Sequence, residues 1–511
     1  RPALPPLSTI ERHIRGRNCE TSPLCGRPLV GMSATVIPLD KIIPEAQKVI
    51  RHLTRSGHKA YLVGGCVRDL LLGRAPKDFD IATDATPSEL RELFRNCRII
   101  GRRFRLAHII FGNKIIETAT FRANPREDEE GAPGPADELY IHRDNVFGTA
   151  EQDARRRDFT VNGLFYDLAA EQVLDYVDGL TDLASRSVRT IGDPNVRFRE
   201  DPVRMLRAVK FAARLGFDIE DATYQALLSH GKEIEKSPVP RVLEEIFRLL
   251  RGGAAVESLM LLRECGLLDV LLPEIAPQLA EHPGLLDPYL QEIDRSVASG
   301  DVPVNAVLLV SLFLPNLLSL FELETRRQAA PLDHISDMLA PLCARLRVAR
   351  RDVDQAKHLL LIQRRITQAR MRGGKLPPST LHREEMRPAF GLHAMVYRVQ
   401  RLAAGADEAA IAQEIAAWPF PGPYLLGSEG DGPRREFAPD REPRDGDRRR
   451  RRRSFEGEAS ERPSVTAAAH ESTPAALNRA ASSGDDEPLL DEEEAALAAF
   501  VAAMRSGRDE E

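Results

Sequence analysis

Three acidic residues stand in contexts that favour metal-assisted chemistry on phosphate esters. Asp78 and Asp80 lie in DFDIAT, residues 78–83, and Glu117 lies in KIIETATFR, residues 114–122. Both segments have the apolar residues of a strand, and residues i and i+2 of a strand point to one face. Carboxylates so close repel each other unless a cation lies between them. We therefore expect Asp78, Asp80 and Glu117 to hold two magnesium ions, which prefer oxygen ligands and phosphate.

A pair of glycines comes shortly before the two aspartates. Gly64 and Gly65 follow the apolar run 60–63 and precede Arg68 and Asp69. Such a turn exposes backbone N–H groups at a helix start, which can bind phosphate. An ordinary strand-to-helix turn would look the same, but the position just before DFD favours phosphate binding.

An arginine run marks a third segment, DARRRDFTVNGLFYD, residues 153–167. Guanidinium groups bind phosphate oxygens in a bidentate manner, which favours Arg157 as a triphosphate ligand. Asp158 can either bind metal or hold an arginine in place. The polar Asn162 interrupts an apolar strand, so we place this segment at a cleft edge rather than on a solvated surface.

The segment EDPVRMLRAVKFAARLGF, residues 200–217, predicts a helix whose start carries Asp201, Arg204 and Arg207. Asp201 could simply cap the helix, with Pro202 as its first residue. The alternative is base recognition, with a carboxylate accepting from an exocyclic amine and a guanidinium donating to a ring nitrogen. Adenine and cytosine share that edge pattern, so such a pair would select both.

The surrounding sequence predicts an α+β head followed by helices. A strand pair at 105–111 and 114–121 should form a hairpin around Gly112 and Asn113. From residue 200 to about 418 the pattern is almost wholly helical, and 123–138 is an acidic loop. The other predicted elements are helices at 42–56, 67–72 and 87–94 and strands at 60–63 and 79–82.

The composition of the 511-residue chain limits the possible classes of protein. Its six cysteines are scattered and include no C-x-x-C pair, so we expect no disulfide framework, as is typical of proteins in the reducing cytoplasm. The longest apolar stretch, 306–321, is broken by Pro315 and Asn316, so we expect a buried helix pair and no membrane span. Residues 1–31 lack periodicity, and we expect the native chain to start at or near Met32.

The formal net charge of −6 arises mainly beyond residue 421, where 14 Arg face 21 Asp or Glu. This tail has too few apolar residues to fold alone. Its arginine run, Arg448, Arg449, Arg450, Arg451, Arg452 and Arg453, predicts binding of RNA backbone, with a solubilising tail as the alternative.

Taken together, GGCVRDLLLG, DFD, RRDFTVN and EDPVRMLRAVKFAARLGF resemble the class II branch of the DNA polymerase beta-like nucleotidyltransferases. The resemblance covers residues 60 to about 250. The family includes CCA-adding tRNA nucleotidyltransferases and bacterial poly(A) polymerases, both template-independent. IIGRRFRLAHIIFG, residues 99–112, the segment 143–167 and the arginine-rich tail are more similar to the poly(A) polymerases.

The resemblance implies a head at 41–180, a neck at 181–260 and a helical body at 261–420, flanked by a disordered or non-native extension at 1–40 and by a disordered, arginine-rich and then acidic tail at 421–511. It implies addition of AMP from ATP to RNA 3′ ends with release of pyrophosphate. Addition of CCA to tRNA is the nearest alternative, and a non-catalytic RNA-binding adaptor is another. A link to the RNA-degradation machinery is a further expectation. Gly163 departs from the Ser or Ala that relatives often carry.

The resemblance also implies a role for each residue singled out above. The expected catalytic residues are Asp78, Asp80, Asp158 and Glu117, without a choice between the last two as third carboxylate. The expected nucleotide ligands are Gly64, Gly65, Arg68, Asp69, Arg157, Asn162, Asp201, Arg204 and Arg207.

Overall fold

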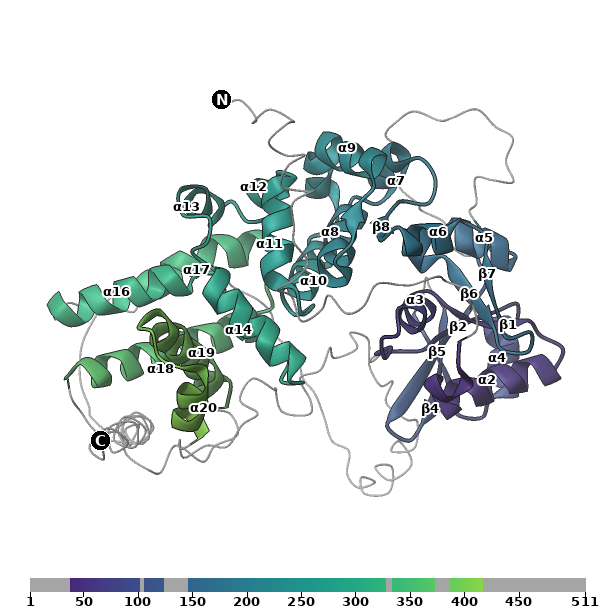
Figure 1. Cartoon of the computed structure of the whole chain (residues 1–511), viewed down its shortest axis with the longest axis horizontal. Coiled ribbons are helices and arrows are strands. Elements are labelled where there is room, and N and C mark those ends of the chain that lie inside the picture. The colour runs from purple at the N-terminus through teal and green to yellow at the C-terminus, as the bar shows by residue number, and fades with distance from the viewer. Residues whose placement is uncertain (1–36, 102–104, 124–145, 328–332, 373–386, 417–511) are drawn as a thin grey trace, which may run out of the picture.

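The computed structural model describes residues 37–101, 105–123, 146–327, 333–372 and 387–416. These residues form a sheet-containing lobe, followed along the chain by a helical lobe (Figure 1). This arrangement confirms the predicted α+β head followed by helices. The predicted extensions, apart from residues 37–40, and most of the acidic loop lie outside the described residues.

A seven-stranded mixed sheet forms the centre of the head, with strand order β3-β4-β5-β2-β1-β6-β7. Within this sheet β2 and β5 pair in parallel, and the other neighbours are antiparallel. The strands are β1 (Ala60–Val63), β2 (Asp80–Thr83), β3 (Cys97–Ile100), β4 (Leu106–Phe111), β5 (Lys114–Thr120), β6 (Leu164–Asp167) and β7 (Gln172–Asp175).

Helix α2 (Pro44–Arg55) packs on the sheet through one apolar stripe. Ala46, Val49, Ile50 and Leu53 recur at helical spacing and are all buried. The packing of the head begins at least as early as Ile37, which is buried and whose carbonyl accepts from the Tyr166 hydroxyl at 3.1 Å. The ordered head therefore starts before the boundary predicted at residue 40.

The predicted hairpin is confirmed, because β4 and β5 pair with Phe111 opposite Lys114 across Gly112 and Asn113. The strand predicted at 79–82 is shifted: β2 begins at Asp80 and ends at Thr83. The other helices of the head are η1 (Leu39–Lys41), α3 (Gly65–Leu71), α4 (Pro87–Leu93), α5 (Ala150–Arg155), η3 (Thr160–Asn162) and α6 (Gly179–Ala184).

The neck begins where a two-stranded sheet, β8 (Ser187–Val188) and β9 (Asp218–Ile219), brackets two helices. These are α7 (Pro194–Glu200) and α8 (Val203–Leu215). Arg74 of the head donates to the carbonyls of Arg214 and Leu215 at 3.2 and 3.4 Å, at the C-terminus of α8. A cation is favourable at that end of a helix, so this contact joins the head to the neck.

The rest of the described chain is helical, as predicted. The apolar stretch 306–321 forms two helices, and the residues of α15 from Ala306 to Ser311 are buried. The break falls at Leu312 and Phe313 rather than at Pro315, which lies in the first turn of α16. The helices are α9 (Asp221–His230), η4 (Gly231–Lys236), α10 (Val239–Leu250), α11 (Ala255–Glu264), α12 (Leu267–Leu271), α13 (Ala276–Glu281), α14 (Asp287–Ala298), α15 (Asn305–Ser311), α16 (Leu314–Arg327), α17 (Asp333–Arg345), α18 (Arg350–Arg372), α19 (Arg387–Ala403) and α20 (Glu408–Ala416).

Within the described residues, no helix combines the length and apolar character that crossing a membrane requires.

Candidate active site at the junction of head and neck

Asp80 and Glu117 are direct neighbours in the sheet. They are paired in register across the parallel strands β2 and β5, so their side chains project from the same face. Asp78 lies two residues earlier, exposed and outside the strand. The expectation that Asp78 and Asp80 share a strand was therefore wrong, because the chain is still in the loop at Asp78.

The three carboxylates influence one another electrostatically. Burial raises the pKa of Asp80 to about 6, and the negative charges of Glu117 and Asp78 add to the shift while Arg157 opposes it. Glu117 and Asp78 thus disfavour the ionised form of Asp80. The site therefore has an excess of negative charge that a bound cation would offset.

The donor set fits magnesium rather than zinc, because Asp78, Asp80 and Glu117 offer only carboxylate oxygens. Among the residues that the structure describes, no three His, Cys, Asp or Glu side chains already converge as a metal site. Glu117 instead directs Oε1 toward His108 Nε2 of β4, at 3.4 Å. The assignment of these three residues as metal ligands stays a prediction.

Gly64 lies where a side chain would collide with an arginine. Its φ is +73°, a conformation that L side chains rarely adopt, and a Cβ built there would approach Arg157 Nη1 to 2.7 Å. Arg157 is held by Asp153 Oδ2, to which its Nε and Nη2 donate at 3.2 and 3.0 Å. The glycine thus lets this arginine approach the turn predicted to bind phosphate.

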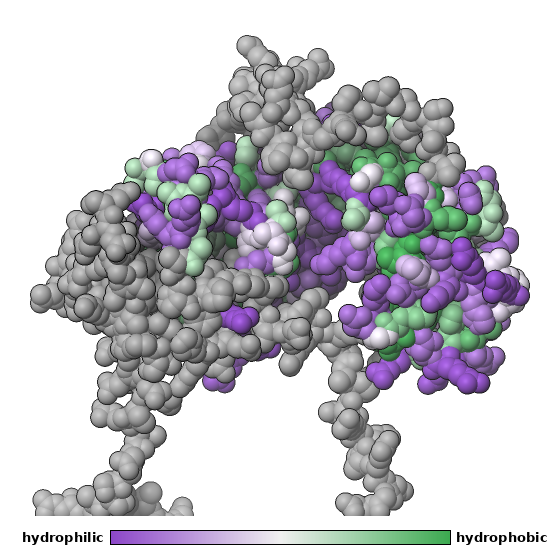
Figure 2. Space-filling view, turned by 60° about the horizontal axis from the view of Figure 1, so that its bottom comes forward, coloured by the Kyte–Doolittle hydropathy of each residue, from purple (hydrophilic) through white to green (hydrophobic). Residues whose placement is uncertain are grey.

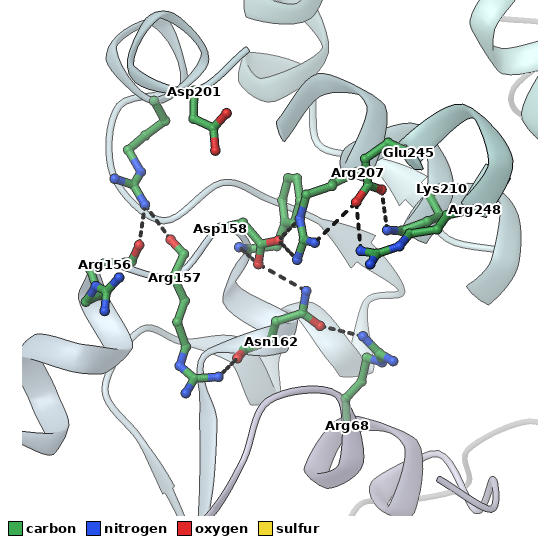
Figure 3. A network of polar contacts seen from close by, with 12 residues as sticks. Arg68, Arg156, Arg157, Asp158, Asn162, Asp201, Arg207, Lys210, Glu245 and Arg248 are labelled. Carbon is green, nitrogen blue, oxygen red and sulfur yellow. Dashed lines mark hydrogen bonds and ion pairs between the residues drawn. The ribbon is translucent and has the colours of Figure 1, made fainter. Parts of the chain in front are cut away.

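Asp158 is bonded to an arginine of the neck. Arg207 Nε donates to Asp158 Oδ2 at 2.7 Å, and Asn162 Nδ2 donates to Asp158 Oδ1 at 3.1 Å (Figure 3). Burial alone would raise the pKa of Asp158, but the Arg207 charge and these hydrogen bonds lower it to about 2. The sequence left two roles open for Asp158, binding a metal or holding an arginine in place. In the structure Asp158 holds Arg207 in place.

Arg68 and Asp69 form a buried pair beside the glycine turn. Arg68 Nε and Nη2 donate to Asp69 Oδ1 at 2.9 and 2.7 Å, and Arg68 Nη1 donates to Asn162 Oδ1. Arg214 of α8 approaches the other oxygen of Asp69 at 3.6 Å. Asp69 is therefore placed to orient arginines rather than to meet a phosphate itself.

Asp201 does not cap α8. It follows the last residue of α7, while Pro202 occupies the N-cap position of α8 without a side-chain hydrogen bond. Its carboxylate accepts from Arg241 Nη2 at 2.8 Å. Arg204 is buried, and its Nη1 donates to Glu200 Oε2 at 3.1 Å. The capping alternative is excluded, and base recognition by Asp201 and Arg204 remains a prediction.

Some residues of the site were not predicted from the sequence. Buried Glu245 of α10 accepts from Lys210 Nζ at 2.6 Å and from Arg248 Nη1 at 3.0 Å, and Arg207 Nη1 lies at 3.8 Å. A signal was present, because Glu245 shares the apolar stripe of Val242, Ile246 and Leu249. A charged residue in such a stripe indicates a buried ion pair.

Arg197 was also missed. This buried residue of α7 donates from Nη1 to Glu200 Oε2 at 2.8 Å and from Nη2 to the carbonyls of Arg156 and Arg157 at 2.8 and 2.5 Å. It thereby ties the arginine run to the neck. Its sequence neighbourhood gives no sign of this contact, which spans about forty residues of chain.

A cavity of about 800 Å³ opens between the head and the neck. All of the residues predicted to bind the nucleotide line this cavity, together with Asp78, Asp80 and Asp158. Glu117 is not among the lining residues. Figure 2 shows mainly hydrophilic residues along the hollow between the two lobes. The cavity suits a strongly charged small molecule that contacts both lobes. Residues 448–453, which are predicted to bind RNA, lie outside the described residues.

Comparison with known proteins agrees with this geometry. Residues 60–189 match the family model described as "Poly A polymerase head domain". Residues 216–279 match one described as "Probable RNA and SrmB- binding site of polymerase A". A solved CCA-adding enzyme of Bacillus stearothermophilus, in complex with CTP, is 25% identical with a TM-score of 0.52, covering 73% of this chain and 82% of that one. The fold and the cavity thus define a nucleotidyltransferase.

Curated relatives narrow the class further. Poly(A) polymerase I of Escherichia coli O6:H1 is 38% identical over 393 residues, which are 72% of this chain and 82% of that protein. The CCA-adding enzyme of Lactobacillus helveticus is 34% identical over 261 residues, 50% of this chain and 61% of that enzyme. The chain belongs to the poly(A) polymerase I family.

Proposed function

We infer that the protein is a template-independent polynucleotide adenylyltransferase. It adds AMP from ATP to RNA 3′ ends and releases pyrophosphate. The observation that carries this conclusion is the similarity to poly(A) polymerase I, which extends over most of both chains. The cavity supports it, because acidic residues for chemistry and arginines for phosphate line one space.

The triphosphate is proposed to lie against the glycine turn. The Gly64 N–H already donates to the Leu164 carbonyl at 2.9 Å, so the Gly65 N–H is the one proposed to face the phosphates. Arg157 supplies a cation that Asp153 holds from behind. Arg68 lies deeper, bonded to Asp69 and Asn162, and adds positive charge at the same wall. Positively charged groups fixed in advance bind the polyphosphate without having to reorganise.

The base is proposed to meet the start of the neck helix. Asp201 would accept from the exocyclic amine of adenine, and Arg204 would donate to a ring nitrogen. Both residues line the cavity, and each has a protein partner that orients it, Arg241 for Asp201 and Glu200 for Arg204. This pair accommodates cytosine as well, so it does not by itself select ATP over CTP.

Two magnesium ions are proposed to be held by Asp78, Asp80 and Glu117. When bound, they would activate the RNA 3′ hydroxyl and stabilise charge on the phosphates. Asp80 and Glu117, held by adjacent strands, would keep the donor oxygens on one face of the sheet. Arg157 lies close enough to Asp80 to influence its charge and would bind the leaving pyrophosphate.

RNA is proposed to bind along the helical lobe and the arginine run at 448–453, chiefly through its backbone. Action in the cytoplasm and association with the RNA-degradation machinery are proposed as the setting of this activity. The match of residues 216–279 to an RNA-binding family model supports the RNA part of the proposal.

CCA addition is the second candidate, because CCA-adding enzymes are relatives over half of the chain. The test offers each nucleotide singly to the purified full chain, with a generic RNA and with tRNA lacking its 3′ end. We expect ATP incorporation into both RNAs. CTP incorporation confined to tRNA would overturn the proposal, and a lack of magnesium-dependent pyrophosphate release would favour the non-catalytic adaptor.

A further inference from the structure

Phe211 of α8 lies among three cations at the wall of the cavity. Its ring centroid is 5.3 Å from Arg68 Cζ, 5.4 Å from Arg207 Cζ and 5.2 Å from Lys210 Nζ. The residue is 8% exposed, and Phe159 packs edge-on against it at 5.7 Å. Cations within about 6 Å of an aromatic face are attracted to it. Phe211 therefore offers a favourable site to cations that would otherwise repel one another.

The same two arginines are also joined through hydrogen bonds. Arg207 donates to Asp158, Asn162 donates to Asp158 with its amide nitrogen, and Arg68 donates to the amide oxygen of Asn162 (Figure 3). A carboxylate only accepts and a guanidinium only donates, so the orientation of the Asn162 amide is fixed by its partners. The five residues Arg68, Asn162, Asp158, Arg207 and Phe211 thus form a closed ring of contacts, here called the arginine ring.

The arginine ring crosses the boundary between the two walls of the cavity. Arg68 belongs to α3 beside the glycine turn, and Arg207 and Phe211 belong to the neck helix α8. Asn162 and Asp158 come from the intervening segment of the head. On its outer side Arg207 is approached by Glu245 of α10 at 3.8 Å. The ring therefore connects the proposed triphosphate wall to the helix proposed to face the base.

We propose that Phe211 and Asn162 are positioning residues that hold Arg68 and Arg207 as one unit for nucleotide binding. This inference rests on the proposed function in that ATP occupies the cavity. Both arginines carry their charge before ATP arrives, so a loosened ring weakens binding in the ground state and the transition state alike. Such a change raises KM and leaves kcat nearly unchanged. Asp80 and Glu117 do not belong to the ring, so the chemical step retains its own residues.

The test compares Phe211→Leu with Phe217→Leu in the full-length protein. Phe217 is 7% exposed, packs in the core just beyond α8 and undergoes the same change of side chain. We measure ATP affinity by calorimetry, steady-state kinetics and thermal unfolding. Phe211→Leu is expected to weaken ATP binding and raise KM by roughly fivefold to thirtyfold, with kcat within about twofold. Phe217→Leu is expected to lower thermal stability similarly and to change KM by less than about twofold.

A double variant separates the ring from independent effects. If Asn162→Ala and Phe211→Leu loosen the same two arginines, the double variant will bind ATP about as weakly as the weaker single variant. If the losses of ATP affinity in the two single variants multiply in the double variant, the proposed arginine ring is wrong. It is also wrong if Phe211→Leu behaves like Phe217→Leu. Calorimetry measures ATP binding without RNA, so it tests the arginine ring independently of catalysis. A wild-type protein that binds ATP but incorporates no AMP into RNA would contradict only the proposed function.

Discussion

Asp80 on β2 and Glu117 on β5 are in-register partners in the parallel strand pair of the central sheet. The sheet fixes the separation of their backbones at one strand spacing and places their carboxylates on one face. Burial raises the pKa of Asp80 to about 6, and the neighbouring Glu117 charge adds to that shift.

Removing Asp80 should abolish most activity and leave the fold intact. Asp80→Ala takes away a carboxylate proposed to bind metal, and incorporation of AMP into RNA should fall at least about a hundredfold. Because repulsion with Glu117 is also removed, the metal-free variant should unfold no earlier than the wild type. Asp84→Asn is the matched control, since Asp84 follows the same strand and contacts His58 and the Lys59 N–H instead. Retained activity in Asp80→Ala would contradict the metal assignment.

Glu117 and Asp158 should differ in what their loss changes. Glu117→Gln should raise the magnesium concentration for half-maximal activity roughly tenfold or more, because a proposed ligand is lost. Asp158→Asn should instead weaken ATP binding and lower the free energy of unfolding by about 1–3 kcal/mol, since Arg207 loses its charged partner. Magnesium titrations and calorimetry measure the two effects. A shifted magnesium requirement in Asp158→Asn alone would reverse the assignment.

Gly64→Ala should harm both stability and ATP binding. With φ +73° and ψ −128°, this backbone lies outside the left-handed helical region, in a conformation that costs about 1–3 kcal/mol for an alanine. The new Cβ would also displace Arg157. Gly73→Ala also places an alanine at positive φ, +70°, but a Cβ built there meets no atom of the described residues within 4 Å apart from its chain neighbours. Chemical denaturation should show a loss in both variants, and ATP affinity should fall only in Gly64→Ala. Equal ATP affinity in the two would contradict the close approach of Arg157.

Asp294 should make stability depend on pH between about 4 and 6. Its carboxylate accepts from the Ala255 N–H at 2.8 Å, and burial raises its pKa from 3.8 to about 6. Through that window the folded protein keeps a proton that the unfolded chain releases, so the free energy of unfolding falls as pH rises. Asp294→Asn removes this dependence. The melting temperature of Asp294→Asn minus that of the wild type should rise from pH 4 to pH 6 and stay constant above pH 6. The same difference for Asp269→Asn, at an exposed position, should show no such trend.

The arginine run of the tail should set part of the salt dependence of RNA binding. Replacing Arg448 to Arg453 with glutamine should weaken binding and reduce the slope of log K against log salt by about 0.7 per lost phosphate contact. Replacement of the same six residues with lysine keeps the charge and should keep the slope. Binding curves over a range of salt concentrations measure both, and an unchanged slope in the glutamine variant would show that the run does not contact RNA.

The sequence predicted the elements whose signals are local. The hairpin followed from Gly112 and Asn113 between two apolar runs, and the strand at 60–63 was predicted with its observed bounds. The sequence also predicted that Asp80 and Glu117 lie on neighbouring strands, because both were assigned as ligands of the same metal ions, and the register of β2 and β5 shows that they do. The position of Asp78 was wrong because strand alternation does not say where a strand begins.

The contacts of the neck escaped prediction for a different reason. Asp158 and Arg207 are 49 residues apart, and Lys210 and Glu245 are 35 apart. Which charges meet depends on how α8 and α10 pack, which no local pattern records. Glu245 is the exception, because a lone acid within an apolar stripe is visible in the sequence even though its three partners are not.

Because β2 and β5 pair in parallel, the distance between Asp80 and Glu117 does not depend on the length of the chain that connects the two strands. The connection from Asp84 to Asn113 forms α4, β3 and β4, and all of it lies outside the two paired strands. Changing the length of the loops within this connection would leave the separation of the two acids unaltered, provided that β2, β5 and the neighbouring β4 stay paired. The strand pairing, and not the length of chain between them, therefore sets how far apart the two acids lie.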